Sequence, residues 1–151
     1  IRGAGGKAFC AGGDVRAVAL SLGRPVPEGE QPLARAYFRE EYALNHLIHH
    51  YEKPYLALVD GLSMGGGLGL SIHGSHRVIT ERLVFSMPET AIGFFPDVGG
   101  TYFLRRCPGQ SALYLALSGQ RLSSRACSAD RRSECTGSSA VVSSRPGRSM
   151  R

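Results

Sequence analysis

Residues 55–73 read YLALVDGLSMGGGLGLSIH, and this stretch decides the fold class. Tyr55–Val59 is a short apolar run of strand length, and we expect it to be buried on both faces of a sheet. Gly61 and Gly65–Gly67 then form a turn, and Leu68–His73 continues as a helix. A strand, a glycine turn and a helix in succession predict an α/β protein that binds its ligand at the strand ends.

The flanking segments continue the same alternation. Leu33–Tyr51 predicts a helix, because apolar residues recur at spacings of three, four and seven. These residues, which we expect to form its buried face, are Leu33, Tyr37, Leu44, Leu47 and Tyr51. Downstream, Arg77–Thr80 and Leu83–Phe85 are typical of short strands, and Thr101–Arg106 is typical of a helix. A chain of 151 residues accommodates one domain of this kind.

Two motifs suggest chemistry of other classes. Gly61–Gly65 (GLSMG) fits the G-x-S-x-G pattern of a serine nucleophile, but no histidine follows Asp97 to complete an acid–histidine order. We therefore favour Ser63 as a small residue in a tight turn. His46 and His50 lie one helical turn apart, as a metal-binding pair would, but the H-E-x-x-H pattern is missing and surface histidines are favoured.

Two glycine clusters, Gly12–Gly13 and Gly65–Gly67, invite a joint interpretation. A glycine turn that opens a helix points its peptide N–H groups at one place. Two such loops that meet can direct two donors at one carbonyl oxygen and form an oxyanion hole, in which each donor is worth ~3–4 kcal/mol. The alternative is a pair of ordinary tight turns.

Three carboxylates are candidates for acid–base work. Glu89 and Asp97 each follow a proline and are separated by a mostly apolar segment, surroundings that raise the pKa of a carboxyl group. Asp97 is alternatively a helix cap. Glu41 shares a helix face with Asn45 and Ile48, which indicates a half-buried position, although spacing alone allows its neighbour Glu40 as well.

Positive charge is concentrated at one end of the chain. Of the net charge of +6, residues 121–151 carry +5, from seven arginines against two acidic residues. Residues 123–151 contain nine serines and six arginines, so we expect a disordered tail that follows a domain over residues 1–122. The tail has no aromatic residue for base stacking, and we expect no nucleic-acid partner.

Several function classes lack support in the sequence. It contains no G-x-x-x-x-G-K-[ST] phosphate loop and no G-x-G-x-x-G fingerprint. No apolar stretch approaches the ~20 residues that a membrane span needs, so we expect no membrane partner. The four cysteines show no C-x-x-C spacing, which favours reduced thiols over a metal centre.

Five segments in this order resemble the crotonase (enoyl-CoA hydratase/isomerase) superfamily, most closely its 3-hydroxyisobutyryl-CoA hydrolase branch. They are Lys7–Asp14 (KAFCAGGD), Phe38–Tyr42 (FREEY), Gly61–Gly67 (GLSMGGG), Met87–Gly93 (MPETAIG) and Phe95–Gly100 (FPDVGG). The resemblance spans about residues 1–122. Because superfamily members have strands before the position of Ile1, we expect the chain to be a fragment.

The resemblance implies a crotonase-like spiral of ββα units, incomplete at both ends, that binds acyl-CoA between two glycine loops. It implies an oxyanion hole formed by Gly13 and Gly66, and catalytic roles for Glu89 and Asp97. The implied substrate-binding residues are Glu41, Gly66, Glu89 and Asp97, without a metal. A hydratase usually has a second glutamate shortly after its glycine triplet, where this chain has Leu68–Leu70.

The resemblance therefore implies hydrolysis of the 3-hydroxyisobutyryl-CoA thioester, a step of valine catabolism, in mitochondria. The only expected partner is the acyl-CoA substrate, whose CoA replaces any separate cofactor, and a homo-oligomer is left open. Two alternatives remain: an enoyl-CoA hydratase/isomerase of the same superfamily, or an inactive truncated product.

Overall fold

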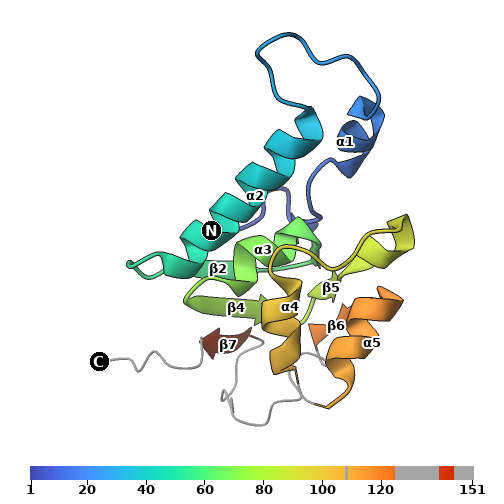
Figure 1. Cartoon of the computed structure of the whole chain (residues 1–151). Coiled ribbons are helices and arrows are strands. Elements are labelled where there is room, and N and C mark those ends of the chain that lie inside the picture. The colour runs from blue at the N-terminus through green and yellow to red at the C-terminus, as the bar shows by residue number, and fades with distance from the viewer. Residues whose placement is uncertain (108, 125–139, 145–151) are drawn as a thin grey trace.

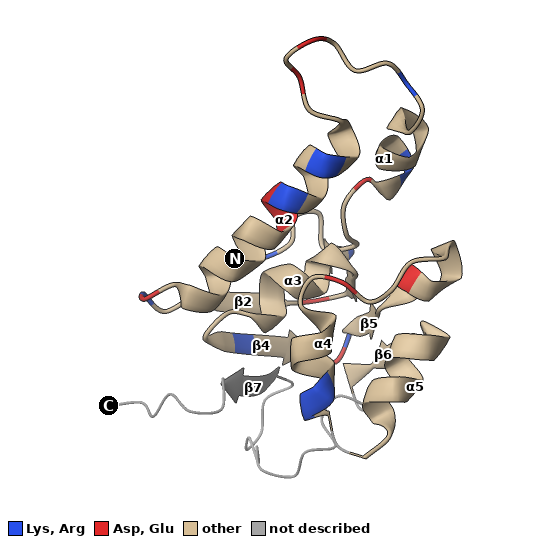
Figure 2. Cartoon of the chain, in the orientation of Figure 1, with Lys and Arg blue, Asp and Glu red and all other residues tan. Residues whose placement is uncertain are grey.

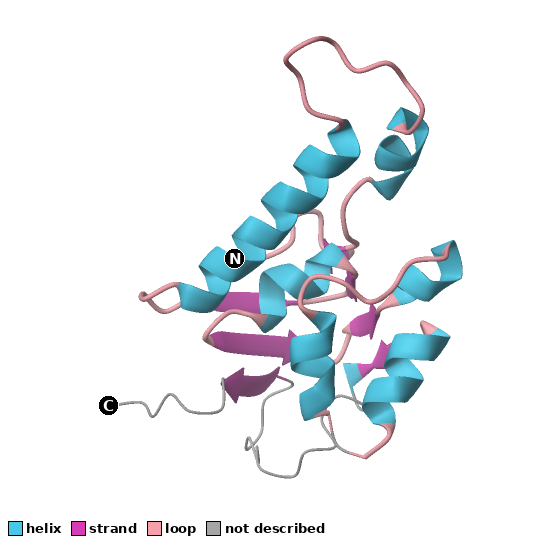
Figure 3. Cartoon of the chain, in the orientation of Figure 1, coloured by secondary structure: helices cyan, strands magenta, loops and turns pink. Residues whose placement is uncertain are grey.

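The computed structural model describes residues 1–107, 109–124 and 140–144. It is a mixed α/β structure with two sheets and helices packed around them (Figures 1 and 3). The first sheet has the order β1-β3-β5-β6, formed by Ala8–Cys10, Leu62–Met64, Val84–Ser86 and Leu122–Ser123. The second has the order β2-β4-β7, formed by Leu56–Val59, His76–Thr80 and Ala140–Ser144.

The helices connect these strands and flank the sheets. The α-helices are α1 (Val15–Ser21), α2 (Leu33–His50), α3 (Gly66–Ile72), α4 (Gly100–Phe103) and α5 (Ser111–Ser118). Two 3-10 helices are η1 (Pro88–Ile92) and η2 (Leu104–Arg106). The helices predicted around residues 33–51, 68–73 and 101–106 are thus all present, with shifted ends.

The chain contributes to the two sheets in a repeating pattern. It passes from β2 in one sheet to β3 in the other, and later from β4 to β5 in the same way. The β2–β4 and β3–β5 pairs are both parallel. The N-terminus begins a third copy, because Arg2 bridges to Leu58 of β2 before β1 pairs with β3. This repetition is the predicted spiral of ββα units.

Glycine is required where α3 starts. Gly65 has a φ of +47°, a backbone conformation that side-chain-bearing residues rarely adopt. A Cβ on Gly67 would collide with the carbonyl oxygen of Cys10. The triplet therefore lets α3 begin directly against the end of β1, which is how the two glycine loops come together.

The core consists of two small apolar clusters. Phe9, Ala57, Val59 and Leu83 form one of them, and Leu68, Met87 and Val98 form the other. The expectation that 55–59 is buried on both faces is wrong. Leu56 and Leu58 are exposed while Ala57 and Val59 are buried, because the described residues cover only one face of β2.

The predicted apolar face of α2 is also wrong. Leu33, Leu44, Leu47 and Tyr51 are exposed, whereas the buried residues of the helix are Asn45 and Ile48. Asn45 fits against α3, where a Cβ on Gly69 would approach its Oδ1 to 2.6 Å. Glu41 lies on the side of α2 that faces α3, because its Oε1 occupies the space that a Cβ on Gly66 would need.

Residues 123–151 were expected to be disordered, but the part of this segment that the structure describes includes residues of two strands. Ser123 belongs to β6, and residues 140–144 form β7, which pairs antiparallel with β4. Without β7, one edge of β4 would present unpaired backbone groups, and a sequence with adjacent valines favours an extended chain that can pair with that edge. Residues 125–139 and 145–151 lie outside the described residues. No helix in the described ranges is long and apolar enough to cross a membrane.

Candidate active site

The two glycine loops contact each other. A Cβ on Gly12 would lie 3.3 Å from the Met64 oxygen and 3.6 Å from the Gly66 nitrogen. Gly66 is the first residue of α3, so its N–H has no acceptor within the helix. Among the described residues, the N–H groups of Gly13 and Gly66 donate no hydrogen bond to a backbone carbonyl in a turn or loop. Neither N–H group is therefore committed to such a carbonyl acceptor.

Two carboxyl groups lie beside the glycine turn, and a third interacts with them, although the three come from separate elements. Figure 2 shows acidic positions in α2, in η1 and in the loop before α4. Glu41 Oε1 occupies the space that a Cβ on Gly66 would need, and Glu89 Oε1 lies 3.1 Å from the place of a Cβ on Gly65. The charges of Asp97 and Glu41 both raise the pKa of Glu89, so the three groups interact.

Glu89 is the most buried of the three. It stands in the first turn of η1 directly after Pro88, and its side chain is 7% exposed. Burial, supported by the charges of Asp97 and Glu41 and opposed by its own backbone N–H, raises its pKa to about 7. Its Oε2 is buried and has no hydrogen-bond partner among the described residues. A carboxyl group of this kind exchanges a proton near neutral pH.

Asp97 is held by α2. The Tyr42 hydroxyl donates a hydrogen bond of 2.9 Å to Asp97 Oδ2. Burial raises the pKa of Asp97, and the bond from Tyr42 opposes that rise. The capping alternative does not apply, because α4 has Gly99 at its N-cap and no side-chain cap.

Glu41 is partly buried whereas Glu40 is exposed, which resolves the choice between them. Burial and the neighbouring charge of Asp97 raise the pKa of Glu41. Sequence reasoning missed two tyrosines here. Tyr42 bonds to Asp97, and the Tyr37 hydroxyl fills the space beside Gly13. Tyr37 lies one helical turn before Glu41, and Tyr42 ends the Phe38–Tyr42 segment of the resemblance, which were the available signals.

The serine alternative finds no support. Ser63 lies within β3 with no exposed surface, and its Oγ has no hydrogen-bond partner among the described residues. A nucleophile elbow instead exposes its serine at a sharp turn.

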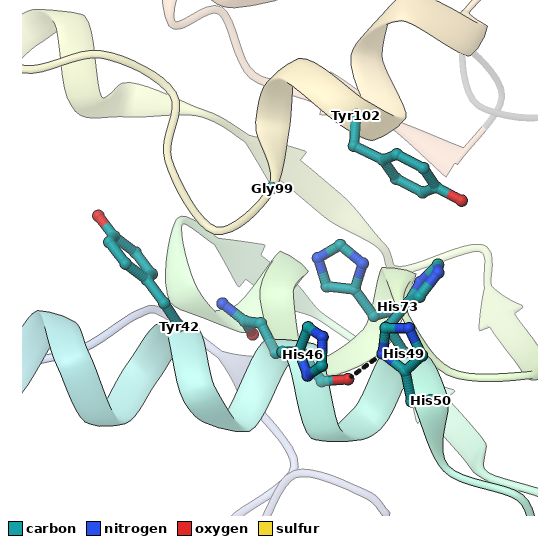
Figure 4. Close-up of a pocket in the computed structure, with 8 residues that line it drawn as sticks. Tyr42, His46, His49, His50, His73, Gly99 and Tyr102 are labelled. Carbon is teal, nitrogen blue, oxygen red and sulfur yellow. Dashed lines mark hydrogen bonds between the residues drawn. The ribbon is translucent and has the colours of Figure 1, made fainter.

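Four of the five histidines, His46, His49, His50 and His73, line a separate groove of about 290 Å³ between α2 and α4 (Figure 4). The rings of His46 and His50 lie 4.1 Å apart, and His73 Nε2 donates to the Val98 carbonyl at 2.7 Å. The described residues contain no group of three or more side chains that could hold a metal ion. Tyr42 also lines the groove, so it lies between the groove and the acidic cluster.

Comparison with known proteins identifies similar sequences and folds. A family model described as enoyl-CoA hydratase/isomerase matches residues 1–134, which extends past residue 122, where we placed the limit of the resemblance. A Xenopus tropicalis protein named "3-hydroxyisobutyryl-CoA hydrolase, mitochondrial" is 62% identical over 122 residues, which are 81% of this chain and 30% of that protein. The Homo sapiens protein of the same name is 54% identical over 125 residues, which are 83% of this chain and 31% of that protein. The chain thus spans about a third of the length of these curated relatives.

Solved structures agree on the architecture. A carnitinyl-CoA dehydratase from Mycobacterium thermoresistibile superposes with a TM-score of 0.74 at 44% identity, over 83% of this chain and 36% of that one. An enoyl-CoA hydratase from Bacillus anthracis gives a TM-score of 0.72 at 27% identity, over 85% of this chain and 47% of that one.

Proposed function

The chain belongs to the enoyl-CoA hydratase/isomerase family, and on that premise we propose that it carries the catalytic centre of a 3-hydroxyisobutyryl-CoA hydrolase. The observation that carries the proposal is the Glu89 carboxyl, 7% exposed and with a pKa raised by burial to about 7, beside the glycine turn that starts α3. The names of relatives 54–62% identical supply the substrate and a mitochondrial location.

In the proposed reaction, the N–H groups of Gly13 and Gly66 donate to the thioester oxygen and stabilise the negative charge that develops there. Glu89 then acts in one of two ways. Its carboxylate attacks the carbonyl carbon, the C–S bond breaks, and water hydrolyses the resulting anhydride. Alternatively, it removes a proton from a water molecule that attacks the same carbon. Either route consumes one water and yields the free acid and the CoA thiol.

Asp97 and Glu41 are proposed to orient the substrate hydroxyl and the attacking water. Both lie within electrostatic reach of Glu89, and both have a pKa raised by burial, as expected for carboxyl groups partly shielded from solvent. All groups in this scheme are side chains or backbone N–H groups of the chain, and CoA enters as part of the substrate.

The residues after the glycine triplet, Leu68–Leu70, favour hydrolysis over hydration because they include no glutamate. Leu68 is buried and belongs to the cluster with Met87 and Val98, so the first turn of α3 contributes packing at this place. Addition of water across a double bond with two glutamates would lack its second acid. Hydration nevertheless stays the second candidate, because solved structures with this fold are named hydratases and dehydratases.

The test compares 3-hydroxyisobutyryl-CoA, isobutyryl-CoA and crotonyl-CoA as substrates. We expect free thiol to be released fastest from the first, more slowly from the second because it lacks the hydroxyl, and no hydration of the third. Glu89→Gln is the inactive variant, and Glu81→Gln, which alters an exposed carboxyl, is its control. Loss of the crotonyl double bond without thiol release would establish the hydratase alternative instead.

A further inference from the structure

The loop that carries Asp97 contains a strained residue. Val98 has a φ of +43°, in the left-handed region that β-branched residues avoid. Its side chain is 1% exposed and packs with Leu68 and Met87. Such strain persists only where the surrounding structure holds the backbone in place.

A hydrogen bond from the end of α3 helps to hold the backbone of this loop. His73, at the end of α3, donates from Nε2 to the Val98 carbonyl oxygen at 2.7 Å. This bond lies one residue beyond Asp97 and fixes the main chain, but it leaves the Asp97 side chain free to rotate.

A second contact, from α2, holds the side chain. The Tyr42 hydroxyl donates to Asp97 Oδ2 at 2.9 Å across 55 residues of sequence. The Tyr42 ring lies 5.8 Å from that of Phe38, which stacks on Phe94 at 5.5 Å. One helix therefore contacts the loop both before Asp97 and at its carboxylate. Figure 4 shows Tyr42 rising from α2 on the side of the loop before Gly99.

We propose that Tyr42 is a positioning residue for Asp97, which fixes one carboxylate oxygen and leaves the other to the substrate. The proposal rests on the proposed function, in which Asp97 orients the substrate hydroxyl or the attacking water. The donated bond also favours the ionised form and so lowers the pKa of Asp97 against the effect of burial. The other titratable groups around Asp97 are Tyr37 and Glu41 of α2 and Glu89 of η1.

Tyr42→Phe tests this role, because it removes the donor and keeps the ring beside Phe38. We expect kcat/KM for 3-hydroxyisobutyryl-CoA to fall about 10- to 100-fold, the range for losing a hydrogen bond to a charged group. The pKa of Asp97 should rise, since its carboxylate loses its stabilising donor. Tyr51→Phe removes an exposed hydroxyl from the end of the same helix and should leave kinetics unchanged.

Two further measurements separate a positioning role from a structural one. In an Asp97→Asn background, Tyr42→Phe should cause little additional loss, because its effect passes through the Asp97 carboxylate. Circular dichroism and the melting temperature of the single variant should match those of the parent. A full additional loss in the Asp97→Asn background would overturn the proposal.

A readout independent of activity separates this proposal from the proposed function. The Asp97 carboxyl carbon can be titrated by NMR in the full chain and in Tyr42→Phe. We expect Asp97 to titrate at higher pH in the variant whether or not the protein hydrolyses any thioester. Identical titration midpoints would refute the role of Tyr42, whereas a shifted midpoint without thiol release from any substrate would refute the proposed function alone.

Discussion

Replacement of Glu89 by glutamine should stabilise the protein at alkaline pH while removing the proposed thioester hydrolysis. Burial raises the pKa of Glu89 from an ordinary 4.5 to about 7 in the folded state. Between these two values, the unfolded chain releases the proton that the folded protein retains. The stability of the folded state therefore falls as pH rises through this window.

The size of the effect follows from the shift. A difference of one pKa unit corresponds to 1.36 kcal/mol, so ionised Glu89 costs the folded protein about 3 kcal/mol above pH 7. Glutamine cannot ionise and is free of that cost. Relative to the parent, the free energy of unfolding of Glu89→Gln should thus increase by about 3 kcal/mol between pH 4 and pH 8.

Urea unfolding of both proteins at pH 4 and pH 8 measures this difference. Glu40→Gln, which alters an exposed carboxyl on α2, is the matched control and should show no such gain. A stability difference between Glu89→Gln and the parent that is the same at both pH values would refute the reasoning. So would a variant less stable than the parent at pH 8 and equal to it at pH 4.

Two other substitutions probe the same centre. Ser63→Ala removes a fully buried hydroxyl that has no hydrogen-bond partner among the described residues. The variant should keep thiol release, and its free energy of unfolding should change by only about 1 kcal/mol. A loss of activity by several orders of magnitude would instead support a serine nucleophile. Gly66→Ala places a methyl group where Glu41 Oε1 lies, so kcat should fall about 100-fold with circular dichroism unchanged; wild-type turnover would contradict the placement of Gly66 and Glu41.

The sequence predicted the fold from local patterns that the structure keeps. The glycine triplet predicted the start of α3. The positive φ of Gly65 favours glycine, and the Cys10 carbonyl oxygen leaves no room for a Cβ on Gly67. Periodicity predicted the length of α2 but not its buried face. That face depends on what lies opposite, and here the partner is Gly69 of α3, which accommodates the polar Asn45.

The site was predictable in its composition and not in its connections. Apolar neighbours and proline spacing indicated a raised pKa for Glu89 and Asp97, and both are raised. The bond from Tyr42 to Asp97 joins residues 55 apart, and no local pattern encodes such a contact. The strained Val98 is equally invisible in sequence, since it follows from tertiary packing that overrides a local preference.

The most direct test of the account is the pH dependence of thiol release from 3-hydroxyisobutyryl-CoA by the parent and by Glu89→Gln. Because Glu89 is proposed to react as the carboxylate, kcat/KM should rise with pH through a midpoint near 7, set by the raised pKa of this group. Glu89→Gln should release no thiol above background at any pH. Thiol release by the variant at the rate of the parent, or a parent profile that is flat from pH 5 to pH 9, would contradict the proposed role of Glu89.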